Sequence, residues 1–535
     1  MKSLLSTTLL ALCACQVHAA ALPKIDGAGL LEQITTLASD EFEGRAPGTQ
    51  GETMTIDYLQ QQFKKLGLEP GNADGSFLQK VPLVGISSHP TLSYTGKDGK
   101  PIQLRFGDDY IAWTVRADKQ LDVANSELVF VGYGIQAPEF KWDDYKGADL
   151  KGKTLVMLIN DPPIADPRHP KLLDPAMFGG NVLTWYGRWN YKFEMAAKQG
   201  AAAALIVHDN KTAGYPYEFV VNSWGRENFA LRSKTPDAGY PAIPGWLNQE
   251  RASDLFKAAG LDFPQLKEQA LSRGFKPVPL GIKINLSTLN ATREITSHNV
   301  VARITGSDPL LKNEAVVYSA HWDHFGIDES LPGPRTQQIF HGAVDNASGV
   351  AALLQIARAY KALPTAPKRT ILFVATTAQE RGLLGAQYYV RHPLVPLGKT
   401  VLNINIDGLN MWGRTRDVEL SGMGKSTADE LVTTVAARQG RVVKPDSNIS
   451  YGSYYRGDQL EFARAGVPTI YLRSSASKLL NYTAHQFHTV HDTVQPNWNL
   501  SGAVDDIGLL FQAGYLAAQG KDQPKWKDGA EFQRR

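Results

Sequence analysis

Three apolar runs of the chain each lead into a side chain that can bind a metal ion. The runs and the side chains that follow them are 315–320 with His321, 371–375 with Glu380, and 401–406 with Asp407. Asp345 lies shortly before a further apolar-faced segment, 349–363. If the runs are parallel strands, their carboxyl ends meet at one edge of a sheet, and we expect these four side chains to lie close together.

A cluster of this kind favours a metal site over a purely structural arrangement. A single histidine after a strand is usually structural, and a single aspartate before a helix is usually an N-cap. Buried carboxylates that stand side by side repel one another and take up protons unless cations neutralise them. Zinc suits imidazole and carboxylate ligands where thiolates are absent. Both cysteines of the chain, Cys13 and Cys15, lie in an N-terminal segment that we expect to be removed.

Strand-like and helix-like segments alternate from about residue 298 onward. Apolar runs at 315–320, 371–375 and 401–406 are separated by helical patterns at 349–363 and from 382. This alternation predicts an α/β fold, with a mostly parallel mixed sheet flanked by helices.

The segment between the helical N-terminal region and this alternation has a different composition. Residues 126–290 contain strand-like runs and many Pro, Trp and Tyr residues, but no cluster of histidines and acids. We therefore predict a discontinuous catalytic domain, 24–125 with 291–520, and an inserted β-rich domain at 126–290.

The first residues have the pattern of an export signal. Lys2 is followed by an apolar stretch at 4–14 and by the small-residue cleavage pattern at 17–19. We expect residues 1–19 to be a signal peptide and the protein to be periplasmic or secreted. Lipid attachment at Cys15 is an alternative, since 12–15 loosely resembles a lipoprotein box.

Composition excludes two classes of partner. The chain is 43% hydrophobic and 20% charged, and its net charge of +3 is small for 535 residues. Lys and Arg form no long run, so we expect no nucleic-acid partner. No apolar stretch after residue 20 approaches the length that spans a bilayer, so we expect no transmembrane segment. The sequence does not determine the oligomeric state.

The combined motifs resemble those of the co-catalytic zinc aminopeptidases, the family that also contains glutamate carboxypeptidases. The motifs that carry this resemblance lie at 39–45, 321–323, 342–349, 380–385, 405–407 and 487–493. The resemblance implies the zinc exopeptidase fold. The predicted insert resembles a protease-associated domain at 132–134 and 198–201.

The resemblance also implies how two zinc ions per chain would be held. Asp345 would bridge the two ions. His321 and Asp407 would complete one of them, and Glu380 and His488 would complete the other.

Three further residues take roles from the same resemblance. Asp323 would orient the His321 imidazole, and Tyr454 would donate to the oxyanion. Gln379 stands where the family usually has an acid that serves as general base, and an amide can orient water but cannot take its proton. Gln459 also stands where the family often has a histidine.

These features predict an exported, zinc-dependent exopeptidase that acts on peptides. An aminopeptidase is favoured over a carboxypeptidase, and Gln379 implies reduced turnover. The competing hypothesis is a zinc- and peptide-binding protein that keeps the peptidase fold but is catalytically impaired. Aminoacyl transfer, as in glutaminyl cyclases, is a third hypothesis.

Overall fold

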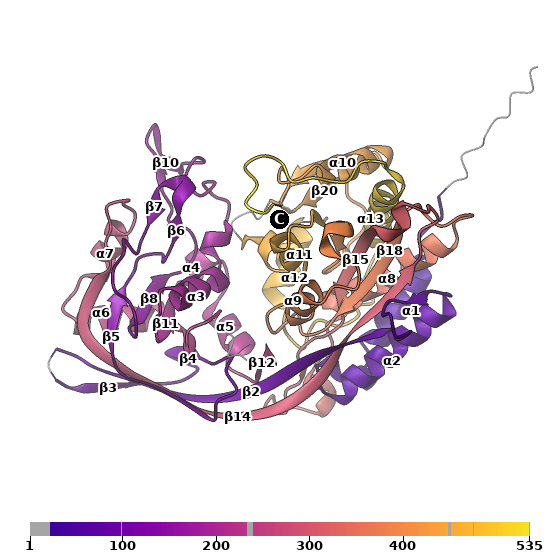
Figure 1. Cartoon of the computed structure of the whole chain (residues 1–535). Coiled ribbons are helices and arrows are strands. Elements are labelled where there is room, and N and C mark those ends of the chain that lie inside the picture. The colour runs from indigo at the N-terminus through magenta and orange to yellow at the C-terminus, as the bar shows by residue number, and fades with distance from the viewer. Residues whose placement is uncertain (1–21, 98, 233–238, 448–450, 475, 534–535) are drawn as a thin grey trace, which may run out of the picture.

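The computed structural model describes residues 22–533 except 98, 233–238, 448–450 and 475. The predicted signal peptide at 1–19 and Cys15 lie outside the described residues. The chain folds into two halves joined by two long strands, β2 (Leu78–Thr95) and β14 (Val278–Ile304). These strands pair antiparallel over their shared length and run beneath both halves (Figure 1).

The half that carries the predicted ligands is built on a mixed sheet. Its strands are ordered β21-β20-β22-β19-β15-β18-β14. Their bounds are β15 (Ala315–His321), β18 (Thr370–Thr376), β19 (Thr400–Asn405), β20 (Asp417–Leu420), β21 (Val442–Pro445) and β22 (Thr469–Arg473). Strand β15 runs parallel to both β18 and β19, and β19 runs parallel to β22. This confirms the predicted α/β fold class.

Helices cover both faces of this sheet (Figure 1). They are α1 (Gly27–Leu37), α2 (Gln50–Lys65), α8 (Ser348–Lys361), α9 (Leu384–Arg391), α10 (Ala428–Arg438), α11 (Gln459–Arg464), α12 (Ala476–His485) and α13 (Ser501–Gln519). Side chains of β15 alternate between the faces, as the twofold period of a strand requires. Tyr318 packs with α8 and α13, whereas Val317 packs with α9 and α11.

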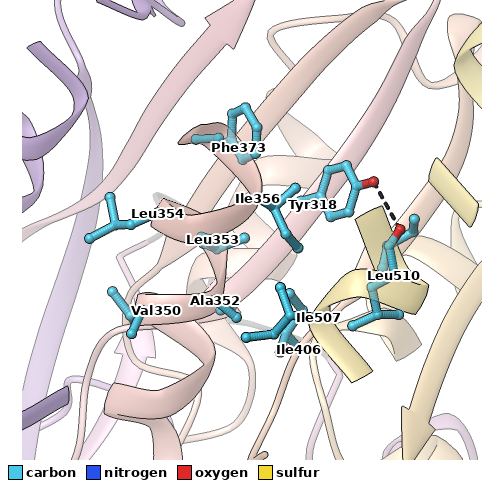
Figure 2. Close-up of a cluster of buried hydrophobic side chains, with 14 of the residues drawn as sticks. Tyr318, Val350, Ala352, Leu353, Leu354, Ile356, Phe373, Ile406, Ile507 and Leu510 are labelled. Atoms are coloured by element: carbon cyan, nitrogen blue, oxygen red, sulfur yellow. Dashed lines mark hydrogen bonds between the residues drawn. The ribbon is translucent and has the colours of Figure 1, made fainter. Parts of the chain in front are cut away.

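The larger core lies between the sheet and helices α8 and α13. Leu353 and Ile356 of α8 meet Phe373 of the sheet and Leu510 of α13 there (Figure 2). The buried hydroxyl of Tyr318 donates to the Leu510 carbonyl at 3.1 Å, so its polar end is satisfied. This packing holds the carboxyl ends of β15, β18 and β19 in fixed relative positions.

The other half continues the same sheet past β14 in the order β5-β8-β11-β13-β4. Its strands are β3 (Pro101–Leu104), β4 (Tyr110–Ala112), β5 (Gln120–Phe130), β8 (Thr154–Leu158), β11 (Ala203–His208), β12 (Asn228–Leu231) and β13 (Ile243–Asn248). Its helices are α3 (Trp189–Lys198), α4 (Asn210–Ala213), α5 (Tyr217–Trp224), α6 (Gln249–Ala258) and α7 (Phe263–Gln269). Short strand pairs in this half are β6 (Gln136–Ala137) with β7 (Trp142–Asp143) and β9 (Ala165–Asp166) with β10 (His169–Leu173). Short pairs elsewhere are β16 (Gly326–Ile327) with β17 (Ile339–Phe340), and β1 (Glu69–Pro70) with β14.

The second hydrophobic core begins earlier in the chain than the predicted insert. Leu92, Tyr94 and Trp113 pack with residues of β5, β8 and β11, whereas the sequence analysis assigned 24–125 to the catalytic part. The reason is that β2 crosses from one half to the other as one unbroken strand. No loop or linker composition marks the point of crossing.

No helix among residues 22–533, outside the gaps, has the length and apolarity needed to cross a membrane.

Candidate active site

Neighbouring strands deliver three of the predicted ligands to one edge of the sheet. His321 is the last residue of β15, and Asp407 follows β19 on one side of it. Glu380 lies in the turn after β18 on the other side. Asp345 lies in the helical turn Ala343–Ala347, which leads directly into α8. His488 comes from the loop after α12 and completes the cluster.

Asp345 stands between the two histidines and offers one oxygen to each. Its Oδ1 lies 3.1 Å from Nε2 of His321, and its Oδ2 lies 3.3 Å from Nε2 of His488. Asp407 Oδ1 lies 3.6 Å from Nε2 of His321, and Glu380 Oε2 lies 3.1 Å from Nε2 of His488. The structure thus brings all five predicted ligands together, in two groups that share Asp345.

The donor atoms fit a divalent metal ion. Nε2 of His321 is buried without a hydrogen-bond partner among the described residues, although it faces two carboxylates. One ligand atom each of His321, Asp345 and Glu380 lies within 4.8 Å of the others. Imidazole nitrogens and carboxylate oxygens that converge in this way are typical of a metal site that lacks cysteine.

The charges of the cluster are strongly coupled. Burial lowers the pKa of His488, but Glu380 and Asp345 outweigh burial and raise this pKa to about 10. Burial raises the pKa of Glu380, but His488 and His324 bring it down to about 2. The carboxylates of Asp345 and Glu380 are therefore ionised at neutral pH. A metal ion must displace the protons that the imidazoles hold, so its binding releases protons.

Asp323 orients both a ligand and the turn that carries another. Its carboxylate accepts the backbone N–H of Gln379 at 2.9 Å and that of Glu380 at 3.3 Å. Its Oδ1 lies 3.7 Å from Nδ1 of His321, which also lies 3.1 Å from the Asp323 carbonyl oxygen. This supports the positioning role expected for Asp323, because imidazole ligands are commonly fixed through the second ring nitrogen.

Gln379 lines the cavity next to Glu380. Its side-chain nitrogen donates to the carbonyl oxygen of Arg456 at 3.2 Å. The acids that line this cavity, among the residues the structure describes, are Asp345, Glu380 and Asp407. All three face histidines, so no further acid of the described chain stands where a general base is expected.

Tyr454 does not face the cavity, which corrects the role expected for it. Its hydroxyl lies 3.0 Å from Oγ1 of Thr469, and its ring is buried against Leu460 and Tyr455. Tyr451, three residues earlier, lines the cavity instead. The loop carries Tyr451, Tyr454 and Tyr455, and their spacing alone does not indicate which ring turns toward the metal ligands.

Arg45 is a positioning residue to which the sequence analysis gave no role. It is fully buried and donates to the carbonyl oxygens of Leu37, Trp322, His341 and Gly342 at 2.6–2.9 Å. These bonds tie the end of β15 to the loop that leads to Asp345. Arg45 belongs to the motif at 39–45, but this motif does not predict which four backbone carbonyl groups the arginine contacts.

His324 and Asp492 also support the ligands. Nδ1 of His324 lies 2.6 Å from Oε1 of Glu380, the oxygen that does not face His488. Asp492 accepts the backbone N–H groups of Val344 and Asp345 at 3.0 Å each. His324 directly follows the motif at 321–323, and Asp492 lies within the motif at 487–493. Their hydrogen-bond partners depend on tertiary packing.

Both halves of the molecule form the cavity over the ligands. Phe219 of α5, in the second half, stacks on the imidazole of His488 with ring centroids 5.0 Å apart and an interplanar angle of 13°. Trp189, Tyr215 and Trp224 contribute further aromatic surface from the same half. The second half therefore forms a wall of the site, although it supplies none of the five predicted ligands.

The α/β fold and the ligand cluster define a candidate metal centre at the carboxyl edge of a sheet. Residues 299–511 match the family model of peptidase family M28. The predicted resemblance to the zinc aminopeptidase family is confirmed. The protease-associated character of the insert stays a prediction.

Individual relatives agree with this assignment. The chain is 28% identical to carboxypeptidase Q of Xenopus laevis, over 51% of this chain and 54% of the relative. It is 31% identical to aminopeptidase NAALADL1 of Mus musculus, over 32% of this chain and 23% of the relative. The matches thus span about half or less of these curated relatives. An aminopeptidase from Aneurinibacillus sp. strain AM-1 shares the fold, with a TM-score of 0.53, 19% identity, and coverage of 96% of this chain and 98% of that one.

Proposed function

We propose that the chain is a zinc exopeptidase that binds two zinc ions and removes N-terminal residues from peptides. The observation that carries this proposal is the position of Asp345, which offers one oxygen to the His321 group and the other to the His488 group. Two zinc ions bound in this way would polarise the peptide carbonyl and acidify a water molecule.

The size of the cavity supports an enzyme that acts on chain ends. Its volume is about 150 Å³, and an engineered protein cavity of about this size holds one benzene ring. Such a space suits one or two terminal residues better than a continuous chain that enters and leaves. Trp189 and Phe219 line it from the second half, and Phe219 stacks on the imidazole of His488.

Gln379 gives the proposed enzyme a low rate. Its amide can hold a water molecule by a hydrogen bond but cannot accept the proton that the water must lose. A positioned base contributes on the order of 10²–10⁴ in rate, so turnover without one is slow. Asp323 keeps the turn that bears Gln379 and Glu380 in place.

The glutamine at position 379, in place of an acid, also favours a second candidate function. A zinc-loaded protein that binds peptides without turning them over would keep all five ligands and lose only the base. Turnover of a panel of aminoacyl-anilides by the purified protein, with zinc content measured on the same sample, separates the two. Slow turnover with bound zinc supports the peptidase, and zinc binding with no turnover of any peptide or anilide supports the binding protein.

We also propose that the protein is exported, on the basis of the charged start, apolar stretch and small-residue pattern within residues 1–19. Mass determination of the protein purified from its natural cells tests this. Loss of these residues supports export, and lipid on Cys15 would indicate the alternative.

A further inference from the structure

The second half of the molecule has a cavity that shares no lining residue with the cavity over the predicted metal ligands. Its volume is about 220 Å³. It lies at the carboxyl ends of β5, β8, β11 and β13, each of which runs parallel to the next. Helix α7 also lines it, on the side of the second half that faces away from the half with the predicted metal ligands (Figure 1).

Each of these four strands contributes to the lining, either with its last residues or with the residues that follow it. Tyr133 follows β5, Leu158 ends β8, Asp209 follows β11, and Gln249 follows β13. Small molecules that bind to open α/β sheets are found outside the carboxyl ends of the strands. The same geometry brings the predicted metal ligands together in the first half. The position of the cavity in the fold is therefore that of a binding site.

The buried part of the lining is apolar and aromatic. It consists of side chains that are at most 7% exposed, namely those of Leu158, Ile159, Val207, Tyr133 and Phe263. A cavity of about 150 Å³ holds one benzene ring, so this larger cavity has space for a benzyl group and for a few polar atoms besides. Such a combination of an apolar interior with a small number of polar groups is typical of small-molecule sites.

Tyr133 presents a polar group without a protein partner. Its backbone is fixed, because its carbonyl oxygen accepts a hydrogen bond from Nζ of the buried Lys192 at 2.6 Å. Its hydroxyl group has no hydrogen-bond partner among the described residues. Burial holds the pKa of Tyr133 well above its ordinary value, so the hydroxyl keeps its proton and can donate. Buried hydroxyl groups normally have a partner, and a molecule in the cavity would supply one.

The charged side chains at this cavity are available to a bound molecule. Neither Lys267 nor Glu268 of α7 has an ion-pair partner among the described residues, and Nζ of Lys267 lies 5.3 Å from the centre of the Phe263 ring. Asp209 uses only Oδ1, which accepts two backbone N–H groups of the turn that follows it. The cavity thus has one cation and two carboxylates, which disfavours a phosphate or another multiply charged anion.

We propose that this cavity binds a free α-amino acid with a large apolar side chain. Lys267 binds the α-carboxylate, the carboxylates of Glu268 and Asp209 bind the ammonium group, and the apolar interior takes the side chain. A zwitterion on an apolar body uses all of these groups at once, whereas a purely apolar molecule would leave the charges unused. The inference goes beyond the proposed peptidase function and does not depend on it, because the cavity is separate from the predicted metal ligands.

Calorimetric titration of the zinc-loaded protein tests the inference with three compounds. They are L-phenylalanine, L-phenylalaninamide, which lacks the carboxylate, and N-acetyl-L-phenylalanine, which lacks the ammonium group. Phenylalanine should bind about ten-fold or more tightly than either analogue, because each analogue loses a hydrogen bond between charged groups. An amino acid could also bind at the metal ligands, so Glu380→Ala is titrated in parallel and should keep the affinity for phenylalanine.

Substitution of Lys267 tests the assigned contact. Lys267→Gln should weaken phenylalanine about ten- to a hundred-fold and leave the affinity for phenylalaninamide unchanged, because the amide has no carboxylate for the lysine to bind. Lys267→Arg keeps the charge and should retain most of the affinity. Lys257→Gln is the matched control, since Lys257 is exposed on the neighbouring helix α6 and does not line the cavity. Circular dichroism establishes that each variant is folded.

Four results would overturn the inference. They are no binding of phenylalanine, unchanged affinity in Lys267→Gln, equal weakening of phenylalanine and its amide in that variant, and loss of binding in Glu380→Ala, which would place the compound at the metal ligands. Equal affinity of the wild type for phenylalanine and its amide would identify the N-terminus of a peptide as the bound group, and would also overturn the assignment to a free amino acid. No measurement here uses turnover, so the proposed peptidase function can fail or stand independently.

Discussion

The two halves of the molecule treat buried arginine in opposite ways. In the half that carries the ligands, Arg45 donates to four carbonyl oxygens and joins segments that are distant in the sequence. In the other half, the side chain of Arg188 is buried at the cavity wall without a hydrogen-bond or ion-pair partner among the described residues. The difference shows that a buried arginine can have either of two roles. One whose N–H groups are hydrogen-bonded to the protein stabilises the fold, and one that lacks protein acceptors beside a cavity is a candidate to bind a ligand.

The same contrast holds for the acids. Asp345, Glu380 and Asp407 face histidines across distances of 3.1–3.6 Å, and backbone and imidazole groups fix the ligand-bearing turns. The second half contributes aromatic rings and a guanidinium to the cavity, but no acid. One half thus supplies the predicted metal ligands, and the other supplies aromatic rings and a cation to the cavity wall.

The largest effect is expected from a ligand in the first half. Glu380→Ala removes a carboxylate from the His488 group and should reduce both zinc content and turnover, the latter to background. Elemental analysis and anilide turnover on the same sample measure this. Asp417→Asn is the control, because Asp417 pairs with Lys444 at the surface and should change neither quantity. Full zinc content in Glu380→Ala would contradict the ligand assignment.

A substitution at Gln379, where a general base is expected, should raise turnover. Gln379→Glu introduces a carboxylate that two cations would hold ionised near neutral pH. Turnover should rise about ten-fold or more, toward the 10²–10⁴ that a positioned base contributes. Steady-state kinetics at equal zinc content measure the change. If turnover is unchanged while the wild type is already fast, another residue serves as base.

Removal of each arginine charge sharpens the comparison between the halves. Arg45→Met removes a donor from four buried carbonyl oxygens, of which that of Gly342 keeps the N–H of Ala347, and should lower the free energy of unfolding by more than about 3 kcal/mol. Arg188→Met removes an unpaired buried charge and should change the free energy of unfolding by less than about 1 kcal/mol, or raise it. Urea unfolding of the two variants measures both values. Equal losses would mean that Arg188 is also part of the scaffold.

The last effect concerns the pH dependence that a buried acid of the second half gives to stability. Burial raises the pKa of Asp144 to about 7, although it accepts the N–H of Ile135 and the indole N–H of Trp142. Between about pH 4 and 7 the folded state binds this proton more tightly than the unfolded state does, so its contribution to stability falls as pH rises, by up to about 1.4 kcal/mol per pH unit.

Asp144→Asn should therefore flatten the fall in the free energy of unfolding across that pH range. Unfolding of wild type and variant at several pH values measures the difference. Asp417→Asn, at the surface of the other half, should keep the wild-type slope. A variant slope equal to that of the wild type would show that Asp144 is ionised in the folded protein at low pH.

The sequence by itself determined the sheet and the ligands at its edge. Strand and helix periodicities are local properties, and parallel strands necessarily bring their carboxyl ends together. His321, Glu380 and Asp407 could therefore be placed side by side from their positions after apolar runs alone. Gln379 in place of an acid was equally visible, since the residues around it fix its position.

Only the tertiary structure decided which way the loop side chains point and which residues of the two halves are in contact. Tyr451 lines the cavity and Tyr454 does not, because packing against Leu460 and Thr469 turns one ring away. The second core starts at Leu92 because β2 passes between the halves without a break. Arg188 reaches the ligand cavity because the second half folds back over it. Such contacts join residues that are far apart in the chain, and no local pattern encodes which of them meet.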